Sequence, residues 1–235
     1  AAIPESVDAV FHVAANTAMW SKLNDQQYQD NVIGTRNMVE VALAKKVKRF
    51  IHTSSIAAYG HHEHEMDETT VSNALESEIN YVRTKYWAQV ILAVYNDDVP
   101  GIPPGNGIFC HVSDIARAHI SAVEKGRTGE RYLLGGADAT FKAVFNTIQR
   151  LIDKKETQFV MPKWLMKAAI PFYLLQSKLN GKEPILTREK FLELTLPKHV
   201  TPKKAVQELD YAMTPLEVSI RDSYEWLKKE NLLGS

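Results

Sequence analysis

The sequence lacks cysteine pairs, an excess of charge of either sign, and any long uninterrupted apolar run. Its 235 residues include one cysteine, Cys110, which excludes an internal disulfide and a metal site built from several cysteines. Lysine plus arginine and aspartate plus glutamate both number 28, so the formal net charge is zero and no block of like charge indicates a nucleic-acid-binding arm. We therefore expect a cytoplasmic protein without a nucleic-acid partner.

Segments that would enter a membrane are also lacking. The first residues, AAIPESVDA, have neither the basic region nor the apolar core of a secretory signal peptide. The most apolar run, Trp164 to Leu179, is too short to span a bilayer and contains Lys167 and Pro171. This pattern favours a buried or interfacial helix, with contact to a membrane surface as the alternative. We expect no membrane partner.

Two strands with a helix between them are predicted in the first part of the chain. Residues 7–15, VDAVFHVAA, are a near-continuous apolar run, typical of a strand buried on both faces of a parallel sheet. Residues 27–47 carry apolar side chains at helical spacing, and residues 49–55, RFIHTSS, form a second apolar strand that ends in hydroxyl residues. The order predicts a crossover unit of an α/β sheet.

The rhythm of strands and helices is interrupted further along. Residues 96–109, NDDVPGIPPGNGIF, are rich in chain breakers and predict no strand where a parallel strand is expected. The first strand also has no predicted neighbour on one side. We expect that residues before Ala1 and near Asp98 to Gly101 belong to the full polypeptide but not to this sequence, and the intact mass of the expressed protein tests this.

The second half of the chain is predominantly helical. The pattern predicts a helix over 111–126 with Ser113 as its N-cap, a short strand over 129–136 and an amphipathic helix over 140–155. We expect two parts: an α/β domain over 1–103 and a mostly helical lobe over 104–235, from which some segments return to the first domain.

One pair of residues indicates chemistry. Tyr81 and Lys85 lie four residues apart in a predicted helix, so they share one helical face, and Ser55 at a strand end precedes Tyr81 by 26 residues. A nearby ammonium group lowers the pKa of a phenol, which can then exchange a proton with a carbonyl oxygen as hydride moves, while a serine hydroxyl holds that oxygen. Tyr224 and Lys228 have the same spacing but no such strand context.

Several ordered motifs carry a family resemblance. VFHVAANT, NVIGTRNMVEVALAKKVKRFIHTSSIAAYG, YVRTK, HVSDIARAHISAVEKG and GERYLLGG resemble the extended short-chain dehydrogenase/reductase superfamily, of the NAD-dependent epimerase/dehydratase type. Within it, the chain is similar to the dihydroflavonol-4-reductase-like and 3β-hydroxysteroid-dehydrogenase-like branch. The resemblance implies a Rossmann-type doubly wound parallel sheet, with residues 1–103 binding NAD(P) and the helical lobe binding substrate.

The resemblance also implies roles for individual residues. Tyr81 would be the general acid and base, Lys85 would bind the nicotinamide ribose and lower the pKa of Tyr81, and Ser55 would orient the substrate, with Ser54 as its neighbouring alternative. Asn31 would support the active site through backbone or water contacts. Further cofactor contacts, beside those of Tyr81 and Lys85, are expected from Val13, Ala14, Ala15 and Thr53.

This sequence departs from the family pattern in its phosphate-binding parts. The glycine-rich loop and the residue that separates NAD from NADP are both absent, so the expected cofactor is NADP or NAD. No metal site is expected, since the histidines His61, His62 and His64 have no supporting ligands at a suitable spacing.

Three functions agree with these residues. The first is reduction of a ketone or aldehyde, or oxidation of the matching alcohol, on a small and fairly apolar molecule. The second is a nucleotide-sugar epimerase or dehydratase with tightly bound NAD, which needs cationic groups for the sugar pyrophosphate. The third is a non-catalytic dinucleotide-sensing protein. A homodimer is a further expectation from the resemblance.

Overall fold

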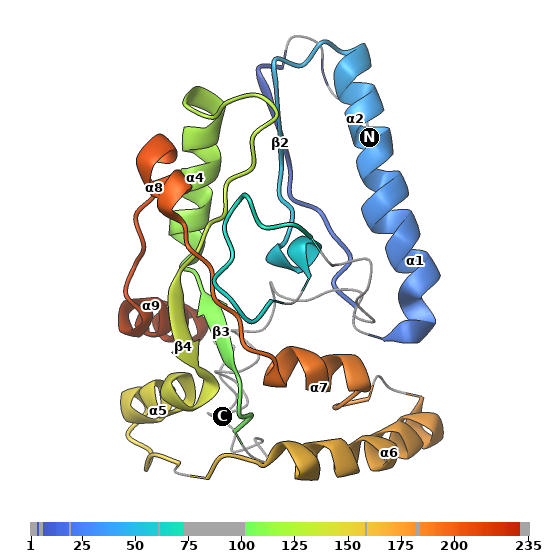
Figure 1. Cartoon of the computed structure of the whole chain (residues 1–235), viewed down its shortest axis with the longest axis vertical. Helices are drawn as coiled ribbons and strands as arrows, with labels where there is room; N and C mark the ends of the chain where they lie inside the picture. Colours follow the sequence, from blue (N-terminus) through green and yellow to red (C-terminus); the bar gives the residue numbers. More distant parts are fainter. Residues whose placement is uncertain are drawn as a thin grey trace.

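The computed structural model describes residues 4, 7–18, 20–60, 62–72, 102–157, 159–181 and 184–230. Its two pairs of strands are flanked by helices, and α6 and α7 form a separate edge of the molecule (Figure 1). No helix in these ranges is long and apolar enough to cross a membrane. The elements in chain order are β1 (Ala9–His12), η1 (Ser21–Leu23), α1 (Asn24–Tyr28), η2 (Gln29–Ile33), α2 (Gly34–Ala44), β2 (Arg49–His52), η3 (Ile56–Tyr59), β3 (Asn106–Phe109), α4 (Val112–Glu124), β4 (Ala137–Thr140), α5 (Phe141–Leu151), α6 (Lys163–Asn180), α7 (Arg188–Thr195), α8 (Lys203–Leu209) and α9 (Leu216–Lys229).

The predicted crossover unit is confirmed. β1 and β2 pair in parallel, with Ala9 opposite Arg49 and His12 opposite His52. The chain between them is helical from Asn24 to Ala44 as α1, the π-helical turn η2 and α2. The α1–α2 segment and α4 lie on opposite sides of this strand pair (Figure 1). The carboxyl ends of both strands therefore point toward the middle of the molecule.

The burial predicted for the first strand is wrong. Phe11 and Val13 are exposed, whereas His12 is buried. In the described residues the pairing partner of β1 is β2, on one of its two edges. A strand gains burial on both faces only when helices and further strands surround it, so the apolar pattern alone did not determine the exposure of these side chains.

A second strand pair corrects two predictions. Residues 106–109, where no strand was expected, form β3, which pairs antiparallel with β4. The strand predicted over 129–136 is also wrong, because the strand begins at Ala137. A Cβ on Gly136 would lie 2.1 Å from the carbonyl oxygen of Phe109, so glycine permits the close approach of the two segments. Local breaker residues obscured a pairing that forms between distant segments.

The cap predicted for the helix after β3 is also different. α4 begins at Val112, and its N-cap is His111 rather than Ser113. The Nδ1 atom of His111 accepts a hydrogen bond of 3.1 Å from the backbone N–H of Ser113. Because Nδ1 accepts, the ring proton of the neutral form is on Nε2, which lies 3.3 Å from a carboxylate oxygen of Asp222. An imidazole nitrogen thus accepts the N-cap hydrogen bond that a hydroxyl or carboxylate oxygen usually accepts.

The main hydrophobic core lies between the β3–β4 pair, α5 and α9. It is formed by buried apolar side chains of these elements and of the chain before β3: Ile102, Phe109, Phe141, Val144, Phe145, Ile148, Ile220 and Leu227. The amphipathic helix predicted from Thr140 is confirmed as α5, whose buried residues recur at helical spacing.

The start of α5 allows a direct test of its cap. The Oγ1 atom of Thr140 accepts a 3.1 Å hydrogen bond from the backbone N–H of Ala143. We expect Thr140→Ala to lower the free energy of unfolding by about 1 kcal/mol, because a first-turn N–H loses its partner. Chemical denaturation measures this, and Thr140→Ser should retain most of the stability. Equal losses in both variants would contradict the capping role.

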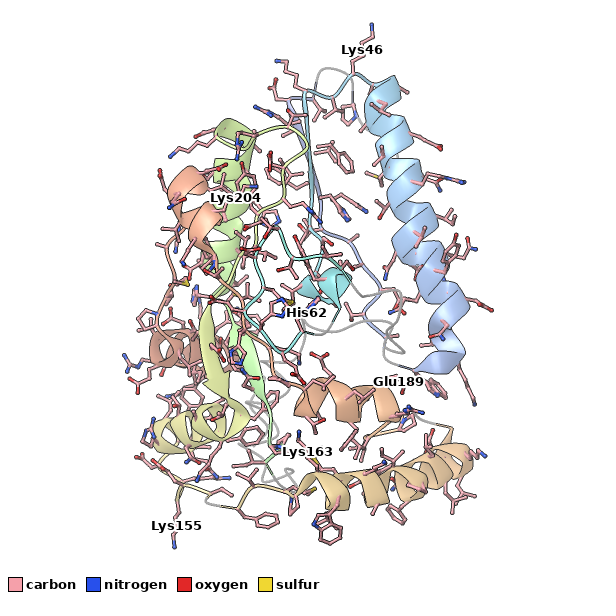
Figure 2. The ribbon with its side chains drawn as sticks, viewed as in Figure 1. Lys46, His62, Lys155, Lys163, Glu189 and Lys204 are labelled. Atoms are coloured by element: carbon pink, nitrogen blue, oxygen red, sulfur yellow. The ribbon has the colours of Figure 1, made fainter. Side chains whose placement is uncertain are left out.

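The helix predicted from Trp164 forms, but it is not buried. Met166 and Ser177 are buried residues of α6, whereas most of its large apolar side chains are exposed. The helix lies along one edge of the molecule with α7 on its inner side, and many of its side chains project outward (Figures 1 and 2). Hydrophobicity of the run was a poor guide to burial because one side of the helix has a packing partner in the described structure and the other does not.

Candidate active site

The candidate site lies where β1 and β2 end. The backbone N–H of Thr53 donates to the carbonyl oxygen of His12 at 3.0 Å, so the two chains stay paired one residue beyond the strands. Ligands of open α/β sheets bind beyond the carboxyl ends of the strands. Three residues predicted to contact cofactor, Val13, Ala14 and Ala15, follow β1 there and are exposed.

Asn31 clamps the chain that leaves β1. Its side-chain Oδ1 accepts from the backbone N–H of Asn16 at 2.6 Å, and its Nδ2 donates to the carbonyl oxygen of Asn16 at 2.9 Å. One amide side chain therefore satisfies both backbone groups of a residue outside the sheet. Asn31 lies in η2, and π-helical turns of this kind occur frequently at functional sites.

Two further side chains of the same helical segment hold this loop. The buried Gln27 donates from Nε2 to the carbonyl oxygens of Asn16 at 3.1 Å and Ala18 at 2.9 Å. Asp30 accepts from the side-chain amide of Asn16 at 2.7 Å. Gln27 and Asn31 are four residues apart and thus share one face. Three side chains of the helical segment therefore hold the chain after β1 from one side.

A chain of hydrogen bonds joins the helix to β1. The hydroxyl of Thr35 donates to the carbonyl oxygen of Asn31 at 2.6 Å. Since a hydroxyl has one hydrogen, the contact of 2.9 Å between His12 Nε2 and Thr35 Oγ1 requires the histidine to donate. The ring of His12 stacks on that of His52, with centroids 5.3 Å apart. Partial burial, and secondly the neighbouring His12, lower the pKa of His52, which favours its neutral form.

Helix α4 contributes a contact that the sequence did not predict. His119 Nδ1 lies 2.7 Å from the carbonyl oxygen of Ile115 and must carry the proton there. In the neutral ring Nε2 then accepts from the hydroxyl of Thr53, 2.5 Å away. Thr53, expected to approach the cofactor, is therefore fixed from both sides, by β1 through its backbone and by α4 through its side chain.

Ser55 is placed directly after this point. Its backbone is extended, and its Oγ accepts a 3.1 Å hydrogen bond from the N–H of Ala57 at the start of η3. A hydroxyl that accepts in this way still has its hydrogen to donate. The turn-forming role and the substrate-orienting role are thus compatible in one side chain. Tyr81 and Lys85 lie outside the described residues, so their distances to Ser55 remain predictions.

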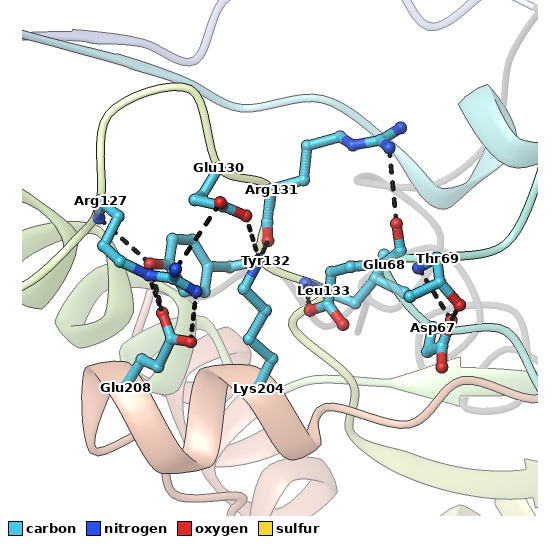
Figure 3. Close-up of polar contacts among 10 residues, drawn as sticks. All are labelled: Asp67, Glu68, Thr69, Arg127, Glu130, Arg131, Tyr132, Leu133, Lys204 and Glu208. Atoms are coloured by element: carbon cyan, nitrogen blue, oxygen red, sulfur yellow. Dashed lines mark hydrogen bonds and ion pairs between the residues drawn. The ribbon is translucent and has the colours of Figure 1, made fainter.

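Three arginines of the second half are engaged within the chain. Arg127 makes a two-bond fork with the carboxylate of Glu208, at 3.0 and 2.6 Å (Figure 3). Arg131 donates to the carbonyl oxygen of Glu68 at 3.4 Å and lies over the ring of Tyr59, 5.4 Å from its centroid. Arg117 is bonded to the buried carboxylate of Asp114.

Figure 3 shows the wider network around Arg127. The hydroxyl of Tyr132 donates to Glu208 at 2.7 Å, and Lys204 contacts the carboxylate of Glu130 at 2.6 Å. On the other side, Glu68 accepts from the backbone N–H of Leu133 at 2.7 Å. Hydrogen bonds from Arg127 and then Tyr132 lower the pKa of Glu208 and favour its charged form. The network connects the segment that follows α4 with α8 on one side and with Glu68 on the other.

Sequence patterns missed several residues of the site, among them Asn16, Gln27, Thr35 and His119. Gln27 carried a usable signal, since it precedes Asn31 by one helical turn. The contact between Thr53 and His119 spans 66 positions, and no local periodicity indicates such a pair. Side chains of this kind are identified only when the path of the chain is known.

Asn31 provides a test of the clamp. We expect Asn31→Ala to lower the free energy of unfolding by about 1–3 kcal/mol, because both backbone groups of Asn16 lose a partner. Chemical denaturation measures the loss, and Asn37→Ala, an exposed asparagine of α2, is the matched control with a change within about 0.5 kcal/mol. Similar stabilities of the two variants would contradict the clamp.

Comparison with known proteins finds similarity to one family. The model of the NAD dependent epimerase/dehydratase family matches residues 1–112. A protein of Synechocystis sp. (strain ATCC 27184 / PCC 6803 / Kazusa) named "Putative dihydroflavonol 4-reductase" is 22% identical, over 95% of this chain and 77% of its own length. That alignment extends over 267 positions, more than the 235 residues here, so the relative has internal residues without a counterpart in this chain.

Two more similar proteins have different names. Sterol demethylase protein B of Methylococcus capsulatus (strain ATCC 33009 / NCIMB 11132 / Bath) is 21% identical, over 97% of this chain and 81% of its own length. The crystal structure of UDP-glucose-4-epimerase from Stenotrophomonas maltophila, with bound NAD and formylated UDP-arabinopyranose, has a TM-score of 0.70 at 16% identity, over 96% of this chain and 77% of that one. The likeness in structure confirms the Rossmann-type α/β fold, and residues 1–112 are similar to the NAD dependent epimerase/dehydratase family.

Proposed function

We propose that this protein is an NAD(P)-dependent oxidoreductase that reduces a ketone or aldehyde, or oxidises the matching secondary alcohol, of a small and fairly apolar molecule. The cofactor, when bound, supplies or accepts the hydride. Ser55 donates a hydrogen bond to the reacting oxygen, Tyr81 transfers the proton to or from it, and Lys85 lowers the pKa of Tyr81. The NAD-dependent family and the bound NAD of the Stenotrophomonas structure support this class of cofactor.

The position of Ser55 is the observation that carries the proposal. It lies at the carboxyl end of β2, and its Oγ is held by the N–H of Ala57, which leaves the hydroxyl hydrogen for an acceptor. A donor fixed in this way stabilises negative charge as it develops on a carbonyl oxygen. Thr53, two residues earlier, is fixed by His119, so the backbone leading to Ser55 is held in place before substrate arrives.

The arginines favour the reductase over the nucleotide-sugar enzyme. A sugar pyrophosphate is bound best by guanidinium groups that present two parallel N–H donors. Arg117 and Arg127 direct their donors to carboxylates of this chain, and Arg131 contacts a carbonyl oxygen and an aromatic ring. To bind a diphosphate, these arginines would first have to break their contacts with Asp114, Glu208 and Glu68.

The names of relatives support different alternatives. The Synechocystis and Methylococcus proteins are named for a flavonoid and a sterol, both largely apolar molecules, and they support an apolar substrate. The Stenotrophomonas enzyme is named for a nucleotide sugar and supports the epimerase alternative. A non-catalytic dinucleotide sensor is the third candidate. The presence in the sequence of all three residues, Ser55, Tyr81 and Lys85, argues against it, because a binding protein without turnover needs none of them for chemistry.

Two assays with the purified full-length protein test the proposal: oxidation of NADPH or NADH with ketones and aldehydes, and reduction of NADP+ or NAD+ with the matching alcohols. We expect turnover with apolar ketones or aldehydes, no conversion of UDP-glucose, and a cofactor that exchanges freely. NAD that remains attached through purification, together with conversion of the nucleotide sugar, would replace the proposal with the epimerase. Saturable cofactor binding without turnover across the ketone, aldehyde and alcohol panel would favour the sensor.

A further inference from the structure

The outward side of α6 has a continuous apolar stripe. Trp164, Ala168, Phe172, Leu175 and Leu179 are separated by four, four, three and four residues, the spacing that places side chains on one helical face. The four large side chains are 70%, 64%, 58% and 81% exposed in that order. Single exposed apolar residues are ordinary on protein surfaces, but a row of them along four turns is not. These five residues form the α6 stripe.

The opposite side of α6 packs onto the protein. Met166 and Ser177 are buried there, and α7 is the neighbouring helix. Figure 1 shows α6 along the lower edge of the molecule with α7 above it. The α6 stripe is exposed and lies across the helix from the buried Met166 and Ser177. Phe159, in the chain that leads to α6, is also 54% exposed and extends the apolar character toward α5.

A row of lysines flanks the α6 stripe. Lys163, Lys167 and Lys178 are exposed and, by their helical spacing, lie together beside the apolar face. The helix contains no aspartate or glutamate over its 18 residues. Lys155 projects from the same edge in Figure 2, whereas the labelled Glu189 lies on α7, away from that edge. On α6 itself, aromatic and leucine side chains are therefore combined with positive charge alone.

The distribution of charge identifies the partner. In an antiparallel two-fold contact between copies, the lysine row of one α6 would meet the same row of the other, and like charges at an interface are costly. In a parallel contact α6 would still supply no carboxylate. A surface that offers both an apolar interior and many negative groups is the headgroup region of an anionic bilayer, where lysine stems extend along apolar material and their ammonium groups reach phosphate.

We propose that α6 is a docking surface for an anionic membrane, lying in the plane of the interface with the α6 stripe inserted among the headgroups. Trp164 suits this position because its ring is apolar and its N–H is polar. A helix that lies in the plane of the interface does not have to be long enough to span the bilayer. This inference reverses the expectation of no membrane partner, and it is independent of the reaction proposed above.

Flotation of the full-length protein with lipid vesicles tests the docking surface. We expect binding to vesicles that contain phosphatidylglycerol and little binding to vesicles of phosphatidylcholine alone, with a marked loss in high salt because ionic attraction is screened. The double variant Phe172→Ser/Leu175→Ser and the triple variant Lys163→Gln/Lys167→Gln/Lys178→Gln should each weaken binding roughly tenfold or more. These side chains are exposed, so both variants should fold.

A matched control distinguishes docking from general stickiness. Val39 and Leu43 are exposed apolar residues of α2, and the double variant Val39→Ser/Leu43→Ser should bind vesicles as the unchanged protein does. Equal binding to neutral and anionic vesicles, or equal losses in the α2 and α6 variants, would overturn the proposal. So would a lipid-free dimer, seen by light scattering, that Phe172→Ser/Leu175→Ser dissociates, because α6 would then be an interface between copies.

Discussion

Replacing Tyr81 with phenylalanine is expected to lower kcat by about 10²–10⁴-fold while the dissociation constant of the cofactor stays nearly unchanged. The proposal assigns Tyr81 to proton transfer at the substrate oxygen, and phenylalanine keeps the ring but removes the hydroxyl. Steady-state kinetics with the best ketone or alcohol measures the first quantity. A fluorescence titration with NADPH or NADH measures the second. Loss of turnover without loss of binding is the result that separates a catalytic group from a structural one.

The chain supplies its own control for this experiment. Tyr224 and Lys228 have the same four-residue spacing on α9, where Tyr224 packs against the main hydrophobic core. Tyr224→Phe should leave kcat unchanged, because the spacing alone confers no chemistry. Unchanged turnover in Tyr81→Phe would refute the assignment of the site. A parallel loss of cofactor binding in that variant would point instead to a damaged fold.

Replacing Asp114 with alanine is expected to cost about 2–4 kcal/mol of unfolding free energy. Its carboxylate is 2% exposed and accepts from the backbone N–H of Thr214 at 2.7 Å and from its hydroxyl at 2.9 Å. Arg117 contributes a further charged contact. Alanine would leave the two donors of the half-buried Thr214 without their acceptor, whereas the guanidinium of Arg117, which is largely exposed, can turn to water. The loss is therefore smaller than for a fully buried ion pair.

Urea denaturation of Asp114→Ala should show a lower midpoint with an unchanged slope, since stability changes and the surface exposed on unfolding does not. Glu124→Ala, an exposed carboxylate of the same helix, is the control, with an expected change within about 0.5 kcal/mol. Asp114→Asn retains one acceptor oxygen and should fall between the two. A loss below that of the control would show that the contact with Thr214 contributes nothing to stability.

Local patterns were sufficient for the parts of the fold that repeat along the chain. The helix between β1 and β2, the parallel pairing of these strands and the amphipathic α5 follow from apolar periodicity and short connections, and all three are present. Ser55 follows β2, and Asn31 bonds to the segment that follows β1. Their catalytic roles remain proposals, as do those of Tyr81 and Lys85.

Contacts between segments far apart in the chain could not be predicted from the sequence. Breaker residues at 106–109 predicted no strand, yet β3 forms because β4 offers backbone partners from 28 to 34 residues further along. His119 became part of the site because α4 packs on β2, and Asp114 became a buried acceptor because the chain passes it again at Thr214. Each depends on a partner that local spacing does not specify.

The sequence by itself determined which residue types could do chemistry and which segments form helices, because both depend on neighbours within a few positions. Only the tertiary structure decided which of these groups meet and which faces stay open. The α6 stripe has the composition of a buried helix, but its exposure depends on whether another element packs on it. Burial is a property of the space around a segment, and hydrogen-bond partners are set by the path of the whole chain, so neither can be obtained from local periodicity alone.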